Sequence, residues 1–278
     1  MTEREQDDIR YRQIIAGMTL MDDEFMTVFF NKRPDLVEYV IRIILERDDL
    51  RVTESKTQYE YRGVTTRSVR MDIRAVDDAG RVYDIEIQRS EDGSGERRAR
   101  MYSSTLDRDL LKKSQDFEEL VDTYVIFITD KDRYGEGFPV YHIDRTIAEL
   151  SHRGFGDGAH ILYVNGEYRN TTEPIGRLMH DFHEKRAAEM LCPPLAEQVK
   201  YYKETEGGVE NMNNELREFW EEKLEKARKQ EREQAERRKT IEFAKSLIAN
   251  GKLSYEEISN ICHLTVDEVK QLASQRTA

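Results

Sequence analysis

Cysteine and long apolar runs are scarce in this chain of 278 residues, and basic residues are fewer than acidic ones. Two cysteines, Cys192 and Cys262, are too few for a disulfide framework or a zinc cluster, and they fit a reducing cytoplasm. No apolar run approaches the roughly 20 residues that a membrane-spanning helix needs. The first residues are polar and contain no secretory hydrophobic region. We therefore expect a cytoplasmic protein that does not contact a membrane.

Acidic residues outnumber basic ones by 56 to 44, which gives a formal net charge of −12. Neutralisation of phosphates supplies most of the non-specific affinity of proteins for nucleic acid. A chain with this charge is therefore a poor general binder of nucleic acid. Any such contact must use a local basic surface or a bound metal ion.

Residues 68–88 have the pattern of two β-strands joined by a tight turn. Every second side chain is apolar, which indicates strands with one buried face. We expect the loop to be Asp78-Ala79-Gly80, because a three-residue hairpin loop commonly has Gly at its last, left-handed position. The alternating apolar residues are Val69, Met71, Ile73 and Ala75 in the first strand, and Tyr83, Ile85 and Ile87 in the second.

This loop places Asp77 opposite Arg81 and Asp72 opposite Glu86. A slip by one residue would set an apolar face beside a polar one, so burial selects this register. Directly opposed β-carbons lie about 4.5–5.5 Å apart. Two carboxylates at that separation repel each other unless they share a hard cation such as Mg²⁺. The residues leave two interpretations open: a metal site, or an exposed polar face neutralised by Arg70 and Arg74.

Three stretches of the chain resemble, in order, the PD-(D/E)XK nuclease family transposases, which are related to the recombination-promoting nucleases. They are RSVRMDIRAVDDAGRVYDIEIQ, RRARMYSSTLDRDLL and YVIFITDKD. The resemblance runs from about Leu20 to the C-terminus and is densest from Ser68 to Asp132. It implies an α/β, restriction-endonuclease-like core, a mixed sheet flanked by helices, that cuts DNA with Mg²⁺. Here an all-helical C-terminal extension follows that core.

The resemblance also implies roles for individual residues. Asp72 and Glu86 would bind the metal, Mg²⁺ or Mn²⁺ in its place. Gln88 would occupy the family's third catalytic position, which is Lys in many PD-(D/E)XK enzymes. A glutamine can orient a water or the scissile phosphate, but it supplies no positive charge. This departure keeps open the alternative of a nuclease fold that has lost cleavage and binds DNA or a protein partner.

Three adjacent acids, Asp22, Asp23 and Glu24, lie at the start of a helix predicted from near Thr19. Acids at a helix N-terminus interact favourably with the helix dipole. The resemblance implies that one acid of this helix joins the active site as a metal ligand. We expect Asp23, with Asp22 and Glu24 as alternatives because the register is ambiguous.

A helix is also predicted from about Glu96, directly after the second hairpin strand, so its first turn should lie near the metal. Arg97, Arg98 and Arg100 are candidates to hold DNA phosphates bidentately. The alternative is a solvated helix face. Tyr102 either lines the site or packs in the core.

Further elements complete the expected core. Residues 121–129 form a continuous apolar run, typical of a strand buried on both faces. With the preceding strand and helix, this run predicts a crossover unit. Residues 34–47 are predicted as a helix, and residues 50–61, 140–143 and 161–165 as strands. We expect the nuclease-like domain to span residues 1–205.

The C-terminal part divides in two. Residues 210–240 are dense in charge and predict an exposed helix through which a homodimer could form. Residues 241–278 predict a small helix-turn-helix-like tail, with capping boxes that begin at Ser254 and Thr265. Asp267 and Glu268 would repel phosphates there, which favours a protein-interaction tail over a DNA-binding one.

The predicted activity is that of a Mg²⁺-dependent deoxyribonuclease, an endonuclease that hydrolyses phosphodiester bonds. The role implied by the resemblance is recombination, movement of mobile DNA, or defence against foreign DNA. DNA is the expected partner. The expected location is the cytoplasm of a bacterial-type cell, at the nucleoid when the protein acts.

Overall fold

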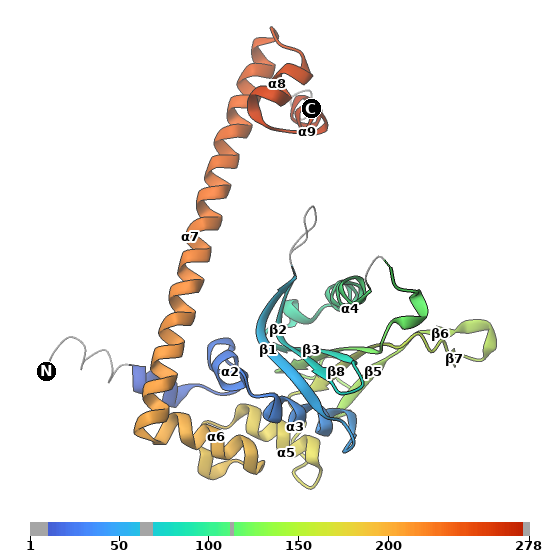
Figure 1. Cartoon of the computed structure of the whole chain (residues 1–278), viewed down its shortest axis with the longest axis vertical. Helices are drawn as coiled ribbons and strands as arrows, with labels where there is room; N and C mark the ends of the chain where they lie inside the picture. The colour runs from blue at the N-terminus through green and yellow to red at the C-terminus, as the bar shows by residue number, and fades with distance from the viewer. Residues whose placement is uncertain (1–10, 62–68, 112–113, 275–278) are drawn as a thin grey trace, which may run out of the picture. The chain divides into compact units, whose positions relative to one another are not determined.

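The computed structural model describes residues 11–61, 69–111 and 114–274. Its centre is a six-stranded mixed sheet with the order β1-β2-β3-β4-β8-β5 (Figure 1). The α/β fold, with a mixed sheet flanked by helices and a helical C-terminal region, is thereby confirmed. The strands are β1 Val52–Tyr61, β2 Val69–Asp77, β3 Val82–Gln88, β4 Thr123–Thr129, β5 Val140–Ile143 and β8 Ala159–Asn165.

The hairpin β2–β3 has the predicted register. Ile73 pairs with Ile85 and Ala75 with Tyr83. Gly80 has φ 81°, and its N–H donates to the carbonyl of Asp77 over 3.0 Å. The left-handed glycine and the apolar pairs therefore fix the hairpin together.

Strands β3 and β4 run parallel, as do β4 and β8, whereas β1–β2, β2–β3 and β5–β8 are antiparallel. Helix α4, Glu96–Leu110, connects β3 to β4, so the predicted crossover is confirmed. This connection matters for function because it returns the first turn of α4 to the end of β3.

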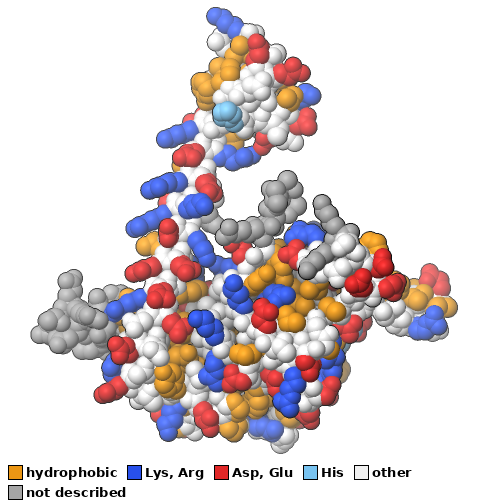
Figure 2. All heavy atoms as spheres, in the orientation of Figure 1, with side chains coloured by type: hydrophobic (Ala, Val, Ile, Leu, Met, Phe, Trp, Pro, Cys, Tyr) orange, Lys and Arg blue, Asp and Glu red, His pale blue; other side chains and the backbone are white. Residues whose placement is uncertain are grey.

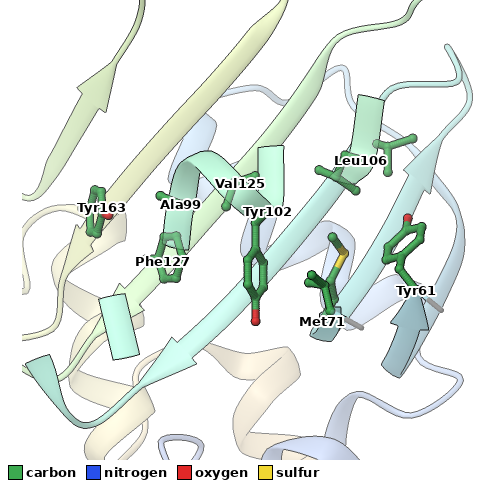
Figure 3. Close-up of a cluster of buried hydrophobic side chains, with 10 residues drawn as sticks. Tyr61, Met71, Ala99, Tyr102, Leu106, Val125, Phe127 and Tyr163 are labelled. Carbon is green, nitrogen blue, oxygen red and sulfur yellow. The ribbon is translucent and has the colours of Figure 1, made fainter. Parts of the chain in front are cut away.

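Helices cover both sides of the sheet (Figure 1). Helix α4 lies on one side, where Tyr102 projects between Phe127 and Met71 in a buried cluster (Figure 3). Helices α2 Asp23–Phe30, α3 Pro34–Leu45, α5 Pro174–His183 and α6 Pro193–Glu204 lie on the other side. Their aromatic rings pack together: Phe29 lies 6.4 Å from Tyr202 between ring centroids.

Prolines and glycines lie at the starts of two C-terminal helices. Pro193 and Pro194 begin α6, because proline is accommodated in a first helical turn. Gly207 and Gly208 lie in the first turns of α7, Glu206–Asn250. A β-carbon at Gly208 would lie 1.9 Å from the carbonyl oxygen of Tyr201, so the glycine permits this close approach. The predicted charged helix, 210–240, is thus part of a longer one.

The chain forms two compact units, Met1–Leu216 and Arg217–Ala278. In the second unit the end of α7 packs with α8 Tyr255–Cys262 and α9 Val266–Ser274 around Ala244, Ile258 and Val269. The capping box at Ser254 is present, with Ser254 N–H donating to Glu257 Oε2 over 2.7 Å. In the middle of α7, acidic and basic side chains alternate on the surface (Figure 2).

The remaining elements are small. A two-stranded ribbon is formed by β6 Thr146–Ile147 and β7 Arg153–Gly154. The described residues also include four short 3₁₀ helices: η1 Glu91–Ser94, η2 Phe117–Glu119, η3 Ala148–Leu150 and η4 Ala187–Glu189. Within the described residues, no helix has the length and apolar character to cross a membrane.

Candidate active site

The acids Asp72 and Glu86 interlock at the end of the β2–β3 ladder. The regular pairing of β2 with β3 extends only to Ile73 and Ile85. Beyond that pair, the N–H of Asp72 donates to Glu86 Oε1 over 2.9 Å, and the N–H of Ile87 donates to Asp72 Oδ2 over 3.0 Å. Each carboxylate therefore replaces a backbone acceptor of the neighbouring strand, which fixes both side chains.

The second oxygen of Glu86 is surrounded by donors. Arg98 Nη2 donates to Glu86 Oε2 over 3.1 Å, and Gln88 Nε2 donates to the same oxygen over 3.3 Å. Arg98 Nη2 also donates to the hydroxyl of Tyr102 over 2.7 Å, and that hydroxyl donates to the carbonyl of Arg70 over 3.1 Å. The first turns of α4 thus lie at the acids, and Tyr102 both contacts them through Arg98 and packs in the core.

Asp84 is a second acid of β3, and it is not among the site residues predicted from the sequence. Its side chain is 0% exposed. Neither of its oxygens has a hydrogen-bond partner among the described residues. The period of two in Asp84-x-Glu86-x-Gln88 places these side chains on one face of the strand, which was a usable signal.

Burial bears on the second interpretation, an exposed polar face made of Asp72 and Glu86. That interpretation is wrong for Glu86, which is 0% exposed on a strand buried on both faces, whereas Asp72 is half-buried. The acid opposite Arg74 is the buried Asp84, not a solvated one, and Arg74 donates to the hydroxyl of Tyr61 over 3.0 Å. The polar face of β3 lies beneath α4 instead of in water.

Burial and the crowding of negative charge raise the pKa values of these acids. Burial, and then the charge of Asp72, raises the pKa of Glu86 to about 8. Burial raises the pKa of Asp72 to about 6, and the nearby charge of Asp23 adds to the rise. Burial and the charges of Glu86 and Asp72 raise the pKa of Asp84 well above its usual value. The protein thus holds these carboxylates where their charged forms are costly.

Of the three N-terminal acids, Asp23 contributes with its charge to the raised pKa of Asp72. Its Oδ1 accepts a hydrogen bond from Gln58 Nε2 over 3.1 Å, which ties α2 to β1 beside β2. Asp22 instead accepts hydrogen bonds from Thr19 and forms an ion pair with Arg89. These contacts favour Asp23 over Asp22 as the acid that joins the site.

The predicted phosphate-binding arginines divide into two kinds. Arg97 and Arg100 are exposed on α4. Arg98 is only half-exposed, since its guanidinium bonds to Glu86 and stacks on the Tyr102 ring at 5.0 Å. Arg98 is therefore bound to the acids, and Arg97 and Arg100 are the ones that face solvent.

The donor set suits a hard divalent cation, since Asp72, Glu86 and Asp23 all offer carboxylate oxygens. Repulsion between buried carboxylates is also what such a cation would relieve. In the described part of the chain, however, no three His, Cys, Asp or Glu side chains are arranged ready to hold a metal. A cation at Glu86 Oε2 would have to take the place of the Arg98 and Gln88 donors.

A mixed sheet with facing acids on a hairpin, followed by a helical crossover, defines a nuclease fold of the PD-(D/E)XK type. Residues 36–173 match the family of PD-(D/E)XK nuclease family transposases, and the chain belongs to that family through this region. No curated protein and no solved structure matched the chain.

The family match covers Asp72, Glu86, Gln88 and α4, but it begins after Asp23 and ends before the C-terminal helices. It is also narrower than the resemblance seen from about Leu20 onward. Membership indicates a nuclease- or transposase-related protein, and nucleases of this type generally use divalent metal ions.

Proposed function

We propose that this protein is a Mg²⁺-dependent endonuclease that hydrolyses phosphodiester bonds in DNA. Its role would be in recombination, in movement of mobile DNA or in defence. The observation that carries the proposal is the interlocked pair Asp72 and Glu86, buried with Asp84 and raised in pKa. A structural protein gains nothing from such a concentration of costly charge, whereas a metal-dependent active site requires it.

Asp72 and Glu86 would hold the cation, with Asp23 as a further carboxylate. When bound, a divalent cation supplies an activated water and stabilises charge that develops on the phosphate. Gln88 would keep Glu86 in place and orient the water or the scissile phosphate. Its Nε2 donates to Glu86 Oε2 over 3.3 Å, and its Oε1 lies so close to Gly93 that a β-carbon there would be 1.9 Å away.

The DNA backbone would be held from α4. Arg97 and Arg100 project from the same helix whose first turns contact the acids. Arg98, the third candidate, already donates to Glu86, so we assign it first to that carboxylate. A local basic surface beside the acids would bind phosphates although the net charge of −12 makes the chain a poor general binder of nucleic acid.

The test is cleavage of supercoiled plasmid by the purified full chain with Mg²⁺ or Mn²⁺, with single-stranded RNA as a second substrate. Wild type should nick or linearise the plasmid. Asp72→Asn and Glu86→Gln should both abolish cleavage, while the surface control Glu222→Gln should not. Cleavage that survives both active-site substitutions would place the site elsewhere.

A second candidate is a nuclease fold that binds DNA or protein without cutting. The observation that favours it is Gln88, which supplies no positive charge where many PD-(D/E)XK enzymes have lysine. Binding of DNA without cleavage under any metal would support this candidate. The homodimer through residues 210–240 is a separate prediction, which sedimentation of the full chain would check.

A further inference from the structure

Gln58 stands out on strand β1 because its backbone is left-handed. Its φ is 53°, although it lies inside a strand between the pairs Thr57–Ile73 and Tyr59–Met71. That register places Gln58 opposite Asp72. A residue with a side chain is strained in this conformation, which persists only where the surroundings fix it. Strain of this kind is concentrated at functional sites, where it re-aims a side chain.

The side-chain amide of Gln58 is fixed by helix α2. Nε2 donates to Asp23 Oδ1 over 3.1 Å and to Thr27 Oγ1 over 3.0 Å. Both donor hydrogens are thereby used on one helix, and Asp23 is held where its charge reaches Asp72. The amide thus links an acid of α2 to the acids of the hairpin.

The oxygen of the same side-chain amide has no hydrogen-bond donor among the described residues. Oε1 of Gln58 is buried and accepts no hydrogen bond from any described residue. A buried amide oxygen without a donor destabilises the folded chain, because its hydrogen bonds to water are lost and not replaced. With Nε2 fixed on Asp23 and Thr27, the amide cannot turn to satisfy Oε1 without losing those bonds. The oxygen therefore remains available to an outside donor.

We propose that Gln58 is a positioning residue of the active site: it holds Asp23 beside Asp72, and its Oε1 accepts a hydrogen bond from a water bound to the divalent cation. This inference rests on the proposed function, since it assigns Gln58 to the metal site of that nuclease. Neutral oxygens that hold metal-bound waters suit Mg²⁺ and Mn²⁺, which keep several waters when bound by proteins.

The test is a calorimetric titration of the full chain with Mn²⁺ alone. The main variant is Gln58→Gly, because glycine adopts a positive φ without strain and removes the amide. We expect its unfolding temperature without metal to match or exceed that of the wild type, while the affinity for Mn²⁺ falls about tenfold. A purely structural glutamine would show the reverse, with lower stability and unchanged affinity.

Two further variants keep the result interpretable. Gln58→Asn retains an amide in a residue type that tolerates the left-handed region, but it is one carbon too short to reach Asp23. It should weaken Mn²⁺ binding as Gln58→Gly does, even if the glycine variant folds poorly.

Asp72→Asn separates the role of Gln58 from the existence of the metal site. If it retains wild-type Mn²⁺ affinity, the proposed site itself is wrong. If it loses binding while both Gln58 variants retain it, only the role of Gln58 is wrong.

Discussion

Two buried aspartates on the same hairpin differ in how their charge is compensated. Asp77 Oδ1 accepts the N–H groups of Ala79 and Arg81 over 3.0 and 2.9 Å. Its Oδ2 accepts Arg81 Nε over 2.6 Å and the hydroxyl of Tyr83 over 2.8 Å. Asp84 is buried as deeply, and no described residue bonds to either of its oxygens.

The contrast separates the two ends of the hairpin. At the closed end, beside the turn, Asp77 is buried with donors to both of its oxygens, and it stabilises the turn. At the open end, opposite the turn, Asp72, Asp84 and Glu86 are gathered; Asp72 and Glu86 accept hydrogen bonds, Asp84 accepts none, and the charges of the neighbouring acids raise the pKa of Asp84 and Glu86. Strongly perturbed acids are concentrated at functional sites, which is why we place the active site at the open end.

The largest expected effect comes from the open end. Glu86→Gln should lower plasmid cleavage by at least about a hundredfold, as expected when charge that stabilises the transition state is lost. The same change removes a buried like charge, so its free energy of unfolding without metal should be equal to or above that of the wild type. Nicking assays and urea unfolding on one preparation would check both. A variant that lost activity only because it unfolded would contradict this expectation.

The closed end should respond in the opposite sense. Asp77→Ala leaves the N–H groups of Ala79 and Arg81 and the Arg81 guanidinium without their acceptor, so we expect a loss of about 2–4 kcal/mol in unfolding free energy. Cleavage per folded molecule should change by less than about twofold. Chemical denaturation measures the first quantity, and cleavage below the unfolding temperature measures the second. Stability unchanged in Asp77→Ala would remove the distinction between the two ends.

The raised pKa values of the acids also predict how stability depends on pH. Glu86 has an ordinary pKa of 4.5 and a folded-state pKa of about 8. Between these values the folded chain binds a proton that the unfolded chain has released, so stability without metal should fall as pH rises. Thermal unfolding across this range in a chelator would show the slope. The slope should be shallower in Glu86→Gln, and identical slopes in the two proteins would contradict the raised pKa.

A smaller effect is expected from substitution of Gly93, which lies against Gln88 at the open end of the hairpin. Gly93→Ala would push a methyl group into Gln88 Oε1 and displace the amide that holds Glu86. We expect cleavage to slow by about tenfold, since small misplacements in an active site are costly. Gly95→Ala is the matched control, because a β-carbon there meets no atom within 4 Å. Equal rates in the two variants would show that Gln88 has no role.

The smallest effect is expected outside the core. Ser254→Ala removes the cap of α8 and should cost the C-terminal unit about 1 kcal/mol. Plasmid cleavage at a temperature where both units are folded should not change. Hydrogen exchange of α8 amides would report the local loss. Reduced cleavage in this variant would instead connect the C-terminal unit to the active site.

Much of the core could be predicted because alternation and turn chemistry act locally. The loop Asp78-Ala79-Gly80 and the apolar pairs specified the register of β2 and β3 without reference to the rest of the chain. The buried run of β4 and the helix before it specified a parallel crossover in the same way. These features depend on neighbours in sequence, which is the information that periodicity carries.

The site could be predicted only in part, because its electrostatics depend on what covers the strand. The pattern showed that Asp72 and Glu86 face each other, but not that α4 buries β3 on its polar side. For that reason Asp84 was not selected. Arg98 was expected on DNA, whereas it donates to Glu86. Gln58 left no signal, since a left-handed backbone inside a strand has no signature in its residue type.

The most direct measurement is a calorimetric titration of Mn²⁺ into the wild type, Asp72→Asn and Glu86→Gln at pH 8, each checked for folding by circular dichroism. If the crowded acids at the open end of the hairpin form the metal site, the wild type will bind Mn²⁺ and both folded variants will lose that binding. Equal Mn²⁺ binding by all three proteins would contradict the assignment of the active site to this hairpin.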